Sequence, residues 1–230
     1  MIYITGDIHA DYDIHKLSST QFPEGLKLTK KDYVIVCGDF GLVWDPSDKI
    51  TNTERYWTEW LSSKPWTTLF VDGNHENHPR LNSYPVEEKF GGKVHKITDS
   101  IYHLMRGEYY EIEGKTFWTM GGATSHDIYL RIKDVDWWME EMPNWEEMSH
   151  GVETLAYYKN RVDYIITHCL PTSKQNELCN WFKIDGLNSY FEKMILSEVK
   201  FKRWYCGHYH QDRDIGDNFT VLYNAIQKIE

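Results

Sequence analysis

The stretch that decides the fold is Tyr3-Ile4-Thr5-Gly6-Asp7-Ile8-His9, close to the start of a chain of 230 residues. The apolar run that begins at Met1 predicts a short buried strand, and Gly6 lets the backbone leave that strand sharply. Asp7 and His9 follow two residues apart, so in extended geometry both side chains point to one side. A carboxylate oxygen beside an imidazole nitrogen suits Mn, Fe, Zn or Ni better than Ca. Taken alone, the pair is more typical of a turn aspartate and a surface histidine, so the rest of the chain must decide.

Four further apolar runs end in the same way, each followed at once by polar residues that can bind a metal. The runs at 33–37, 68–71, 163–167 and 203–206 lead into Gly38-Asp39, Gly73-Asn74-His75-Glu76, His168 and Gly207-His208-Tyr209-His210. In a parallel α/β sheet, ligands gather outside the carboxyl ends of the strands. The five runs therefore predict one rim that carries Asp7, His9, Asp39, Asn74, His75, His168, His208 and His210.

The order of the predicted elements indicates an α/β fold. Strands at 1–5, 33–37 and 68–71 alternate with helical segments near 11–20 and 50–62, which favours right-handed parallel crossovers. A further helix near 149–160 and a last strand at 219–222 complete the pattern. We expect a central two-sheet α/β sandwich, with residues 1–230 forming a single domain.

Two regions depart from this alternation. Between 94 and 121, four short β-rich runs predict an antiparallel meander with a tight turn at Glu113-Gly114. Residues 122–150 show neither the helical nor the strand periodicity of apolar residues, and they combine acidic residues with Trp137, Trp138 and Trp145. We expect this stretch to be an irregular insertion that acts as a lid.

The composition argues against several classes of protein. Hydrophobic residues make up 41% of the chain and aromatic residues 15%, enough for a substantial core. No apolar run approaches the roughly 18 residues that a membrane span needs, and no signal peptide is recognisable. The four cysteines are scattered and are expected to be free thiols in a reducing cytoplasm. The net charge of −10 argues against a broad basic face for nucleic acid, although cations bound in a cleft would create a local positive site.

The ordered series GDIH, GDF, GNHE, THC and GHYH closely resembles the calcineurin-like metallophosphoesterases, and the resemblance spans residues 6–210. It implies a four-layer α-β-β-α sandwich of two mixed sheets flanked by helices, with two divalent metal ions at the rim. Carried over by position, it implies one ion held by Asp7, His9 and His210, a second held by Asn74, His168 and His208, and Asp39 as the carboxylate shared between them. His75 resembles the histidine that lies beside the substrate.

The resemblance implies metal-dependent hydrolysis of phosphomonoesters or phosphodiesters. Two cations about 3.5–4 Å apart need an anionic oxygen between them, and a bridging water is acidified to an attacking hydroxide. His75 is then placed to assist the leaving group, although it could instead support a ligand or simply pack. Glu76 and Asp11 are candidates for orienting the ligand imidazoles. We expect Mn first, with Fe, Zn or Ni as alternatives, because mixed nitrogen and oxygen ligands accept several ions.

Several residues near the motifs are candidates for binding substrate. Arg80 and Arg131 could each contact phosphate or form a surface salt bridge, and His126 could reach the cleft or cap a turn. The remaining histidines have no motif and are expected to be structural or on the surface: His15, His78, His95, His103 and His150. The tryptophans of the lid could stack on a nucleobase, or could pack the insertion onto the body.

Three other functions remain open as alternatives. After Asp39 the chain reads Phe40-Gly41 and lacks the Asp-Arg-Gly of the protein serine/threonine phosphatase branch, which puts protein phosphatase activity in doubt. The acidic residues of the lid would repel a long polyanion, so a nuclease could act only on nucleic-acid ends and extended duplex is disfavoured. The complete ligand set argues against an inactive scaffold. We expect the partner to be a small phosphoester or a nucleotide, with no membrane involved.

Overall fold

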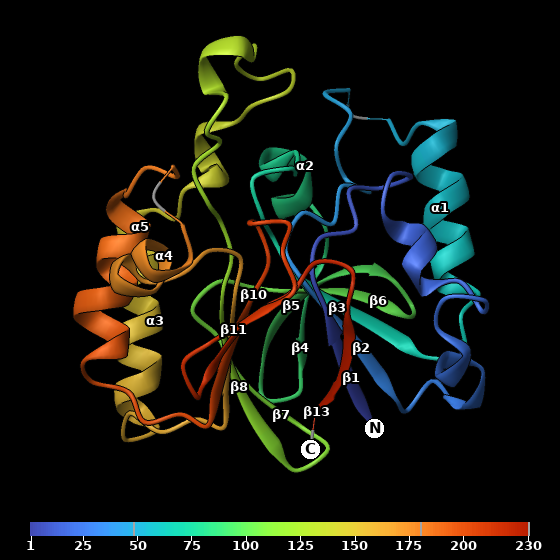
Figure 1. Ribbon diagram of the computed structural model, residues 1–230. Helices are drawn as coiled ribbons and strands as arrows, with labels where there is room; N and C mark the ends of the chain where they lie inside the picture. The colour runs from blue at the N-terminus through green and yellow to red at the C-terminus, as the bar shows by residue number, and fades with distance from the viewer. Residues whose placement is uncertain (48, 180, 230) are drawn as a thin grey trace.

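Two mixed sheets lie against each other, and helices cover the outer face of each sheet (Figure 1). The structure is a computed structural model that describes residues 1–47, 49–179 and 181–229. Its layers follow the predicted order of helices, sheet, sheet and helices. The fold class predicted from the sequence is therefore confirmed.

The first sheet has seven strands, with parallel strands at its centre. Across the sheet they are β13 (Ile226–Ile229), β1 (Ile2–Thr5), β2 (Tyr33–Cys37), β3 (Thr67–Val71), β6 (Ile101–Leu104), β5 (Gly92–Thr98) and β4 (Val86–Lys89). β1, β2, β3 and β6 are parallel neighbours, whereas β13, β5 and β4 pair antiparallel. β1 and β3 are buried along their whole length, because both faces of the sheet are covered.

The second sheet has six strands and the same plan. In order they are β11 (Arg213–Ile215), β12 (Phe219–Val221), β10 (Arg203–Cys206), β9 (Tyr164–Thr167), β8 (Lys115–Met120) and β7 (Tyr109–Ile112). β12, β10, β9 and β8 are parallel, and the edge strands β11 and β7 are antiparallel. Alternate side chains of these strands enter two different cores, one between the sheets and one under the helices.

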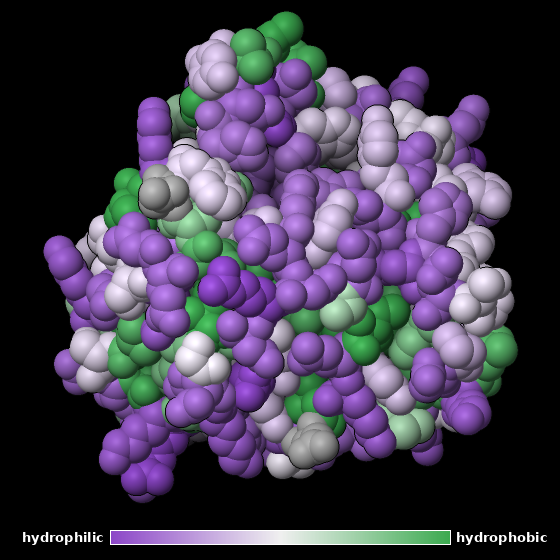
Figure 2. Space-filling model, viewed as in Figure 1, coloured by the Kyte–Doolittle hydropathy of each residue, from purple (hydrophilic) through white to green (hydrophobic). Residues whose placement is uncertain are grey.

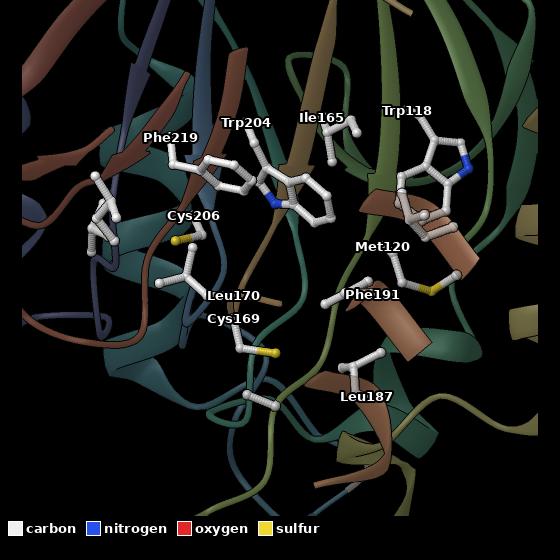
Figure 3. Packing of buried hydrophobic residues seen from close by; sticks show 14 of the residues in the cluster. Trp118, Met120, Ile165, Cys169, Leu170, Leu187, Phe191, Trp204, Cys206 and Phe219 are labelled. Carbon is white, nitrogen blue, oxygen red and sulfur yellow. The ribbon is translucent and has the colours of Figure 1, made fainter. Parts of the chain in front are cut away.

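The outer helices bury these sheet faces. The first sheet carries α1 (Asn52–Ser62), α2 (His78–Asn82) and the 3-10 helices η1 (Ile14–Leu17) and η2 (Pro23–Lys27). The second carries α3 (Trp145–Tyr157), α4 (Thr172–Leu178), α5 (Gly186–Tyr190) and the π-helical η5 (Phe191–Leu196). Figure 3 shows this second outer core, where Phe191 and Phe219 both contact Trp204.

The predicted meander between 94 and 121 is wrong. Its four runs form two hairpins that belong to different sheets, β5–β6 in the first and β7–β8 in the second. The chain changes sheet at Gly107, whose φ of +76° is unfavourable for other residues and where a Cβ would lie 2.8 Å from the backbone nitrogen of Gly151. The tight turn at Glu113-Gly114 is confirmed, with φ of +52° and +71° at its two residues.

The segment 122–144 projects from the body in Figure 1 and contains only the short 3-10 helices η3 (Ile128–Leu130) and η4 (Met139–Glu141). Exposed apolar side chains at 128–132 give its tip the green colour at the top of Figure 2. α3 begins at Trp145, earlier than expected, because Asn144 and Glu147 form a reciprocal capping box. None of the helices that the structure describes has both the length and the hydrophobicity to cross a membrane.

Candidate metal centre

The carboxyl ends of five strands meet at one rim and bring the predicted residues together. Ligand atoms of three sets lie within 4.8 Å of one another, namely Asp7, His9 and His210; Asp39, His168 and His208; and His9, Asp39 and His75. β1, β2 and β3 of the first sheet supply the earlier residues, and β9 and β10 of the second supply the later ones. His9 and Asp39 each belong to two of the sets, and Asp39 occupies the middle of the rim because its carboxylate approaches both His9 and His168.

Unusual backbone conformations aim these side chains inward. His9, Asp39, His208 and His210 all have positive φ, between 38° and 69°. This region is uncommon for residues other than glycine and is a form of strain that clusters at functional sites. The glycines of the motifs have a different purpose, because a Cβ on Gly207 would lie 2.0 Å from Asp7 Oδ1. The glycine leaves room for a carboxylate that arrives from the other sheet.

Asp39 is the buried carboxylate at the centre. Its Oδ1 accepts hydrogen bonds from the backbone N–H groups of Asn74 and His75, both at 2.8 Å. Its Oδ2 lies 3.1 Å from His9 Nε2, and its Oδ1 lies 3.2 Å from His168 Nε2. Burial alone would raise the pKa of Asp39, but the charges of His168 and His75 and the hydrogen bonds outweigh it and hold the pKa well below its usual range. The group is therefore a fixed anion.

The first cluster contains Asp7, His9 and His210. Asp7 is fully buried, accepts the backbone N–H of His208 at 3.0 Å, and lies 3.3 Å from His210 Nε2. Burial opposes the ionisation of Asp7, but His210, His168 and His9 lower its pKa overall. His9 donates from Nδ1 to Asp13 Oδ2 at 2.7 Å, which leaves its Nε2 facing the rim. Burial lowers the pKa of His9, yet Asp39 and Asp7 raise it to about 9, so this cluster attracts cations.

The second cluster contains Asn74, His168 and His208. His168 Nδ1 donates to the carbonyl of Cys37 at 2.7 Å, which directs Nε2 towards Asp39. Asn74 Oδ1 is buried and makes no hydrogen bond within the described part of the chain, whereas His168 Nε2 lies 3.2 Å from Asp39 Oδ1. Buried polar atoms are normally paired, so an unpaired amide oxygen in the loop that binds an anionic carboxylate fits a divalent metal ion. Burial and the neighbouring His168 lower the pKa of His208 to about 3, which keeps its imidazole neutral and able to bind a metal.

A chain of hydrogen bonds fixes Asn74 from behind. Its Nδ2 donates to Ser125 Oγ at 3.3 Å, and that hydroxyl donates to Glu141 Oε2 at 2.7 Å. The backbone N–H of Ser125 also donates to Glu141, at 2.8 Å. The segment 122–144 therefore holds the amide nitrogen of Asn74 and leaves its oxygen free to bind a metal.

The residues predicted to orient the imidazoles are not the ones that do so. Glu76 is fully buried and accepts the backbone N–H groups of Phe40 at 2.5 Å and Gly73 at 2.8 Å, so it joins two strand-end loops. Asp11 is exposed, and Asp13 holds His9 instead. His9 and Asp13 are only four residues apart, in the turn before η1, and this short separation was the signal that could have identified Asp13.

Two more residues of the rim were missed. Tyr223 donates to Asp13 Oδ1 at 3.0 Å and stacks on His210, with centroids 4.7 Å apart. Lys16 is buried and donates to the carbonyls of Gly6 at 3.1 Å and Asp7 at 2.5 Å. Burial lowers the pKa of Lys16 to about 8. Lys16 also donates to the carbonyl of Tyr223, and no local pattern links residues so far apart.

The candidate substrate-binding residues lie in different places. Arg131 Nη2 donates to His75 Nε2 at 3.2 Å, and Asp127 fixes its guanidinium from the other side. Burial and the Arg131 charge help to lower the pKa of His75. Arg80 pairs with Glu54 and with backbone carbonyls of the loop after residue 44. His126 is exposed and touches Phe182, which in turn contacts His208.

The aromatic side chains of the expected lid do not act together. Trp138 is buried and packs edge-on against Trp44, at 5.3 Å between centroids, whereas Trp145 is 76% exposed on α3.

Among the remaining histidines, His78, His95 and His103 are buried around Asp72 and Arg106, on the far side of β3 from the rim residues. Burial lowers the pKa of His78 to about 3 and that of His95 to about 4, which fits structural roles.

Comparison with known proteins agrees with this geometry. A family model described as calcineurin-like phosphoesterase matches residues 1–212 of the chain. The match includes every residue of both clusters. A search of curated proteins finds no significant match.

Proposed function

The chain belongs to the calcineurin-like phosphoesterase family, and from that premise we propose that it hydrolyses small phosphomonoesters or phosphodiesters with the help of two divalent metal ions. The family implies a phosphoric ester hydrolase that uses divalent metals. The observation that carries the more specific proposal is the position of Asp39, whose carboxylate lies 3.1 Å from His9 Nε2 of the first cluster and 3.2 Å from His168 Nε2 of the second. An anion in that position offsets the repulsion between two cations.

The proposed ligands are the residues that converge at the rim. Asp7, His9 and His210 would hold one ion, Asn74, His168 and His208 would hold the other, and Asp39, which lies close to both His9 and His168, would be the shared carboxylate. When bound, such ions lower the pKa of water towards neutrality and stabilise the charge that develops on a phosphoryl group. The mixture of imidazole, amide and carboxylate favours Mn, with Fe, Zn or Ni as alternatives.

The protein's own groups on the substrate side are His75 and Arg131. Arg131 donates to His75 and is itself fixed by Asp127, so its guanidinium is already oriented towards the rim. We assign to it the binding of a phosphate oxygen, because a planar guanidinium matches phosphate geometry. His75 lies beside His9 and Asp39, where it can assist the leaving oxygen.

The proposal extends to the organisation of the chain. Residues 1–230 act as one catalytic domain, and the segment 122–144 serves as a lid that supplies Arg131 and supports Asn74. Its acidic residues disfavour long duplexes, which supports a small phosphoester or nucleotide as substrate. The four cysteines are buried free thiols, which supports a cytoplasmic location.

Hydrolysis of p-nitrophenyl phosphate and of its bis ester tests the proposal. Chelation should abolish turnover, and added Mn should restore it. Asp39→Asn should lower kcat by at least about a thousandfold, because several kcal/mol of charge stabilisation depend on the ions it holds. Asp99→Asn is the matched control, since Asp99 is 96% exposed on a distant turn. Unchanged activity in Asp39→Asn would refute the mechanism, and cleavage of single-stranded DNA ends in preference to both esters would favour a nuclease.

A further inference from the structure

A pocket next to the first cluster is lined by several aromatic rings, of which Trp44 and Tyr12 have no part in the mechanism above. Its volume is about 450 Å³, within the range of small-molecule sites. His9, His75 and His210 form one end of it, so a phosphoester held at the rim would extend its alcohol group into this space. The other walls include Trp44, Tyr12 and Tyr223.

The aromatic walls are suited to a flat ring. Trp44 is held in place, because it stacks on His75 with centroids 5.3 Å apart and meets Trp138 edge-on. Tyr12 is 83% exposed, so its ring is available to a ligand. Stacking of a base on an aromatic side chain is worth about 1–3 kcal/mol. A planar group in the pocket would therefore add binding that an aliphatic alcohol could not.

The charge of the pocket limits the substrate further. Asp11 and Asp13 both line it, and no lysine or arginine is among the lining residues in the described chain. Asp13 is engaged by His9 and Tyr223, whereas Asp11 is exposed and can accept hydrogen bonds from a ligand's amino group. A second phosphate in this space would be repelled by the carboxylates. The pocket therefore suits an uncharged alcohol that bears amino groups.

We propose that this pocket binds the nucleoside part of a nucleoside monophosphate, with the base against Trp44 and Tyr12. The inference rests on the proposed function, because the phosphate must lie at the rim. The base would stack in this pocket and not on the expected lid, because the tryptophans of the lid do not line the pocket. Nucleoside diphosphates are poorer substrates, because removal of their terminal phosphate would place the inner one beside Asp11 and Asp13.

The test compares AMP with ribose 5-phosphate, which have the same leaving oxygen and differ in the base. AMP should have a kcat/KM about 10–100-fold higher, which corresponds to the stacking contribution. ADP should be poorer than AMP at low ionic strength. Trp44→Ala and Tyr12→Ala should each move the ratio of kcat/KM for AMP to kcat/KM for ribose 5-phosphate towards one, even if they also lower the activity with both substrates. Trp145→Ala, on exposed α3, is the matched control and should leave the ratio unchanged.

A binding measurement separates this inference from the proposed function. Adenosine has no phosphate, and calorimetry or ligand-observed NMR should detect its binding to metal-free protein and the weakening of that binding in Trp44→Ala. The inference would be overturned if the protein cleaved p-nitrophenyl phosphate but had nearly the same kcat/KM for AMP and ribose 5-phosphate. It would also be overturned if Trp44→Ala left the preference for AMP unchanged. If the unaltered protein bound adenosine but cleaved none of the esters, the result would instead count against the proposed function.

Discussion

The two clusters at the rim use similar side chains but differ in their exposure. In the first, His210 is 52% exposed and His9 14%, and both border the open pocket. In the second, His168 is completely buried and Asn74 nearly so. The chemistry of the donors is much the same, so the difference lies in what surrounds them.

The surroundings determine what each cluster loses without an ion. Asn74 Oδ1 of the buried cluster has no hydrogen bond within the described chain and cannot turn to water, and an unpaired buried polar group costs about 1–3 kcal/mol. The imidazole of His210 is exposed, so it can hydrogen-bond to water when no ion is bound. We therefore expect the buried cluster to bind its ion more tightly, and the exposed cluster to exchange its ion and to face the substrate.

The strongest test of this comparison removes one histidine from each cluster. His168→Ala should lose one tightly bound ion and lower kcat by about a thousandfold or more, because several kcal/mol of charge stabilisation depend on that ion. His210→Ala should keep the tight ion and lose about 10–100-fold in affinity for the other. Elemental analysis after dialysis and a Mn titration measure both effects. His150→Ala, a partly exposed histidine paired with Glu108, is the control, and equal losses in the two variants would contradict the comparison.

A smaller effect is expected from the hydroxyl behind the buried cluster. Ser125→Ala removes the group that orients the Asn74 amide and should weaken the tight ion by about 10–100-fold. Thr124→Ala is a matched control, because the hydroxyl of Thr124 donates to Asp185 instead. Mn titration monitored by electron paramagnetic resonance measures the affinity, and thermal unfolding shows whether the fold is intact. If both variants bound Mn equally, the orienting role of Ser125 would be wrong.

The rim could be predicted from the sequence because it follows a local rule. β1, β2, β3, β9 and β10 each deliver their polar residues within four positions of the end of the strand, so the order of the chain alone indicates the ligands. The glycines mark the same places, since Gly207 must leave room for Asp7. Strand pairing is not local in this way. β4, β11 and β13 were not predicted, and the meander was wrong because the choice of sheet at Gly107 depends on distant contacts.

The support of the rim shows the same limit. Asp13 was within reach of the sequence, since it lies only four residues after His9 in the same turn. Ser125 and Glu141 are 16 residues apart in an irregular segment, and Lys16 meets Tyr223 across 207 positions. Such pairs carry no periodic signal, so only the folded chain brings them together.

The smallest expected effect concerns the hydroxyl of Tyr223, on the exposed side. Tyr223→Phe removes the hydrogen bond to Asp13 but keeps the ring that stacks on His210. Asp13 still accepts from His9 and is 20% exposed, so water can replace the lost donor. We expect the exposed ion to bind less than about tenfold more weakly, in contrast to the larger loss for the buried hydroxyl of Ser125. Calorimetric Mn titration beside Tyr157→Phe, an exposed tyrosine on α3, measures the difference. A loss in Tyr223→Phe as large as that in Ser125→Ala would mean that exposure does not set how firmly each cluster holds its ion.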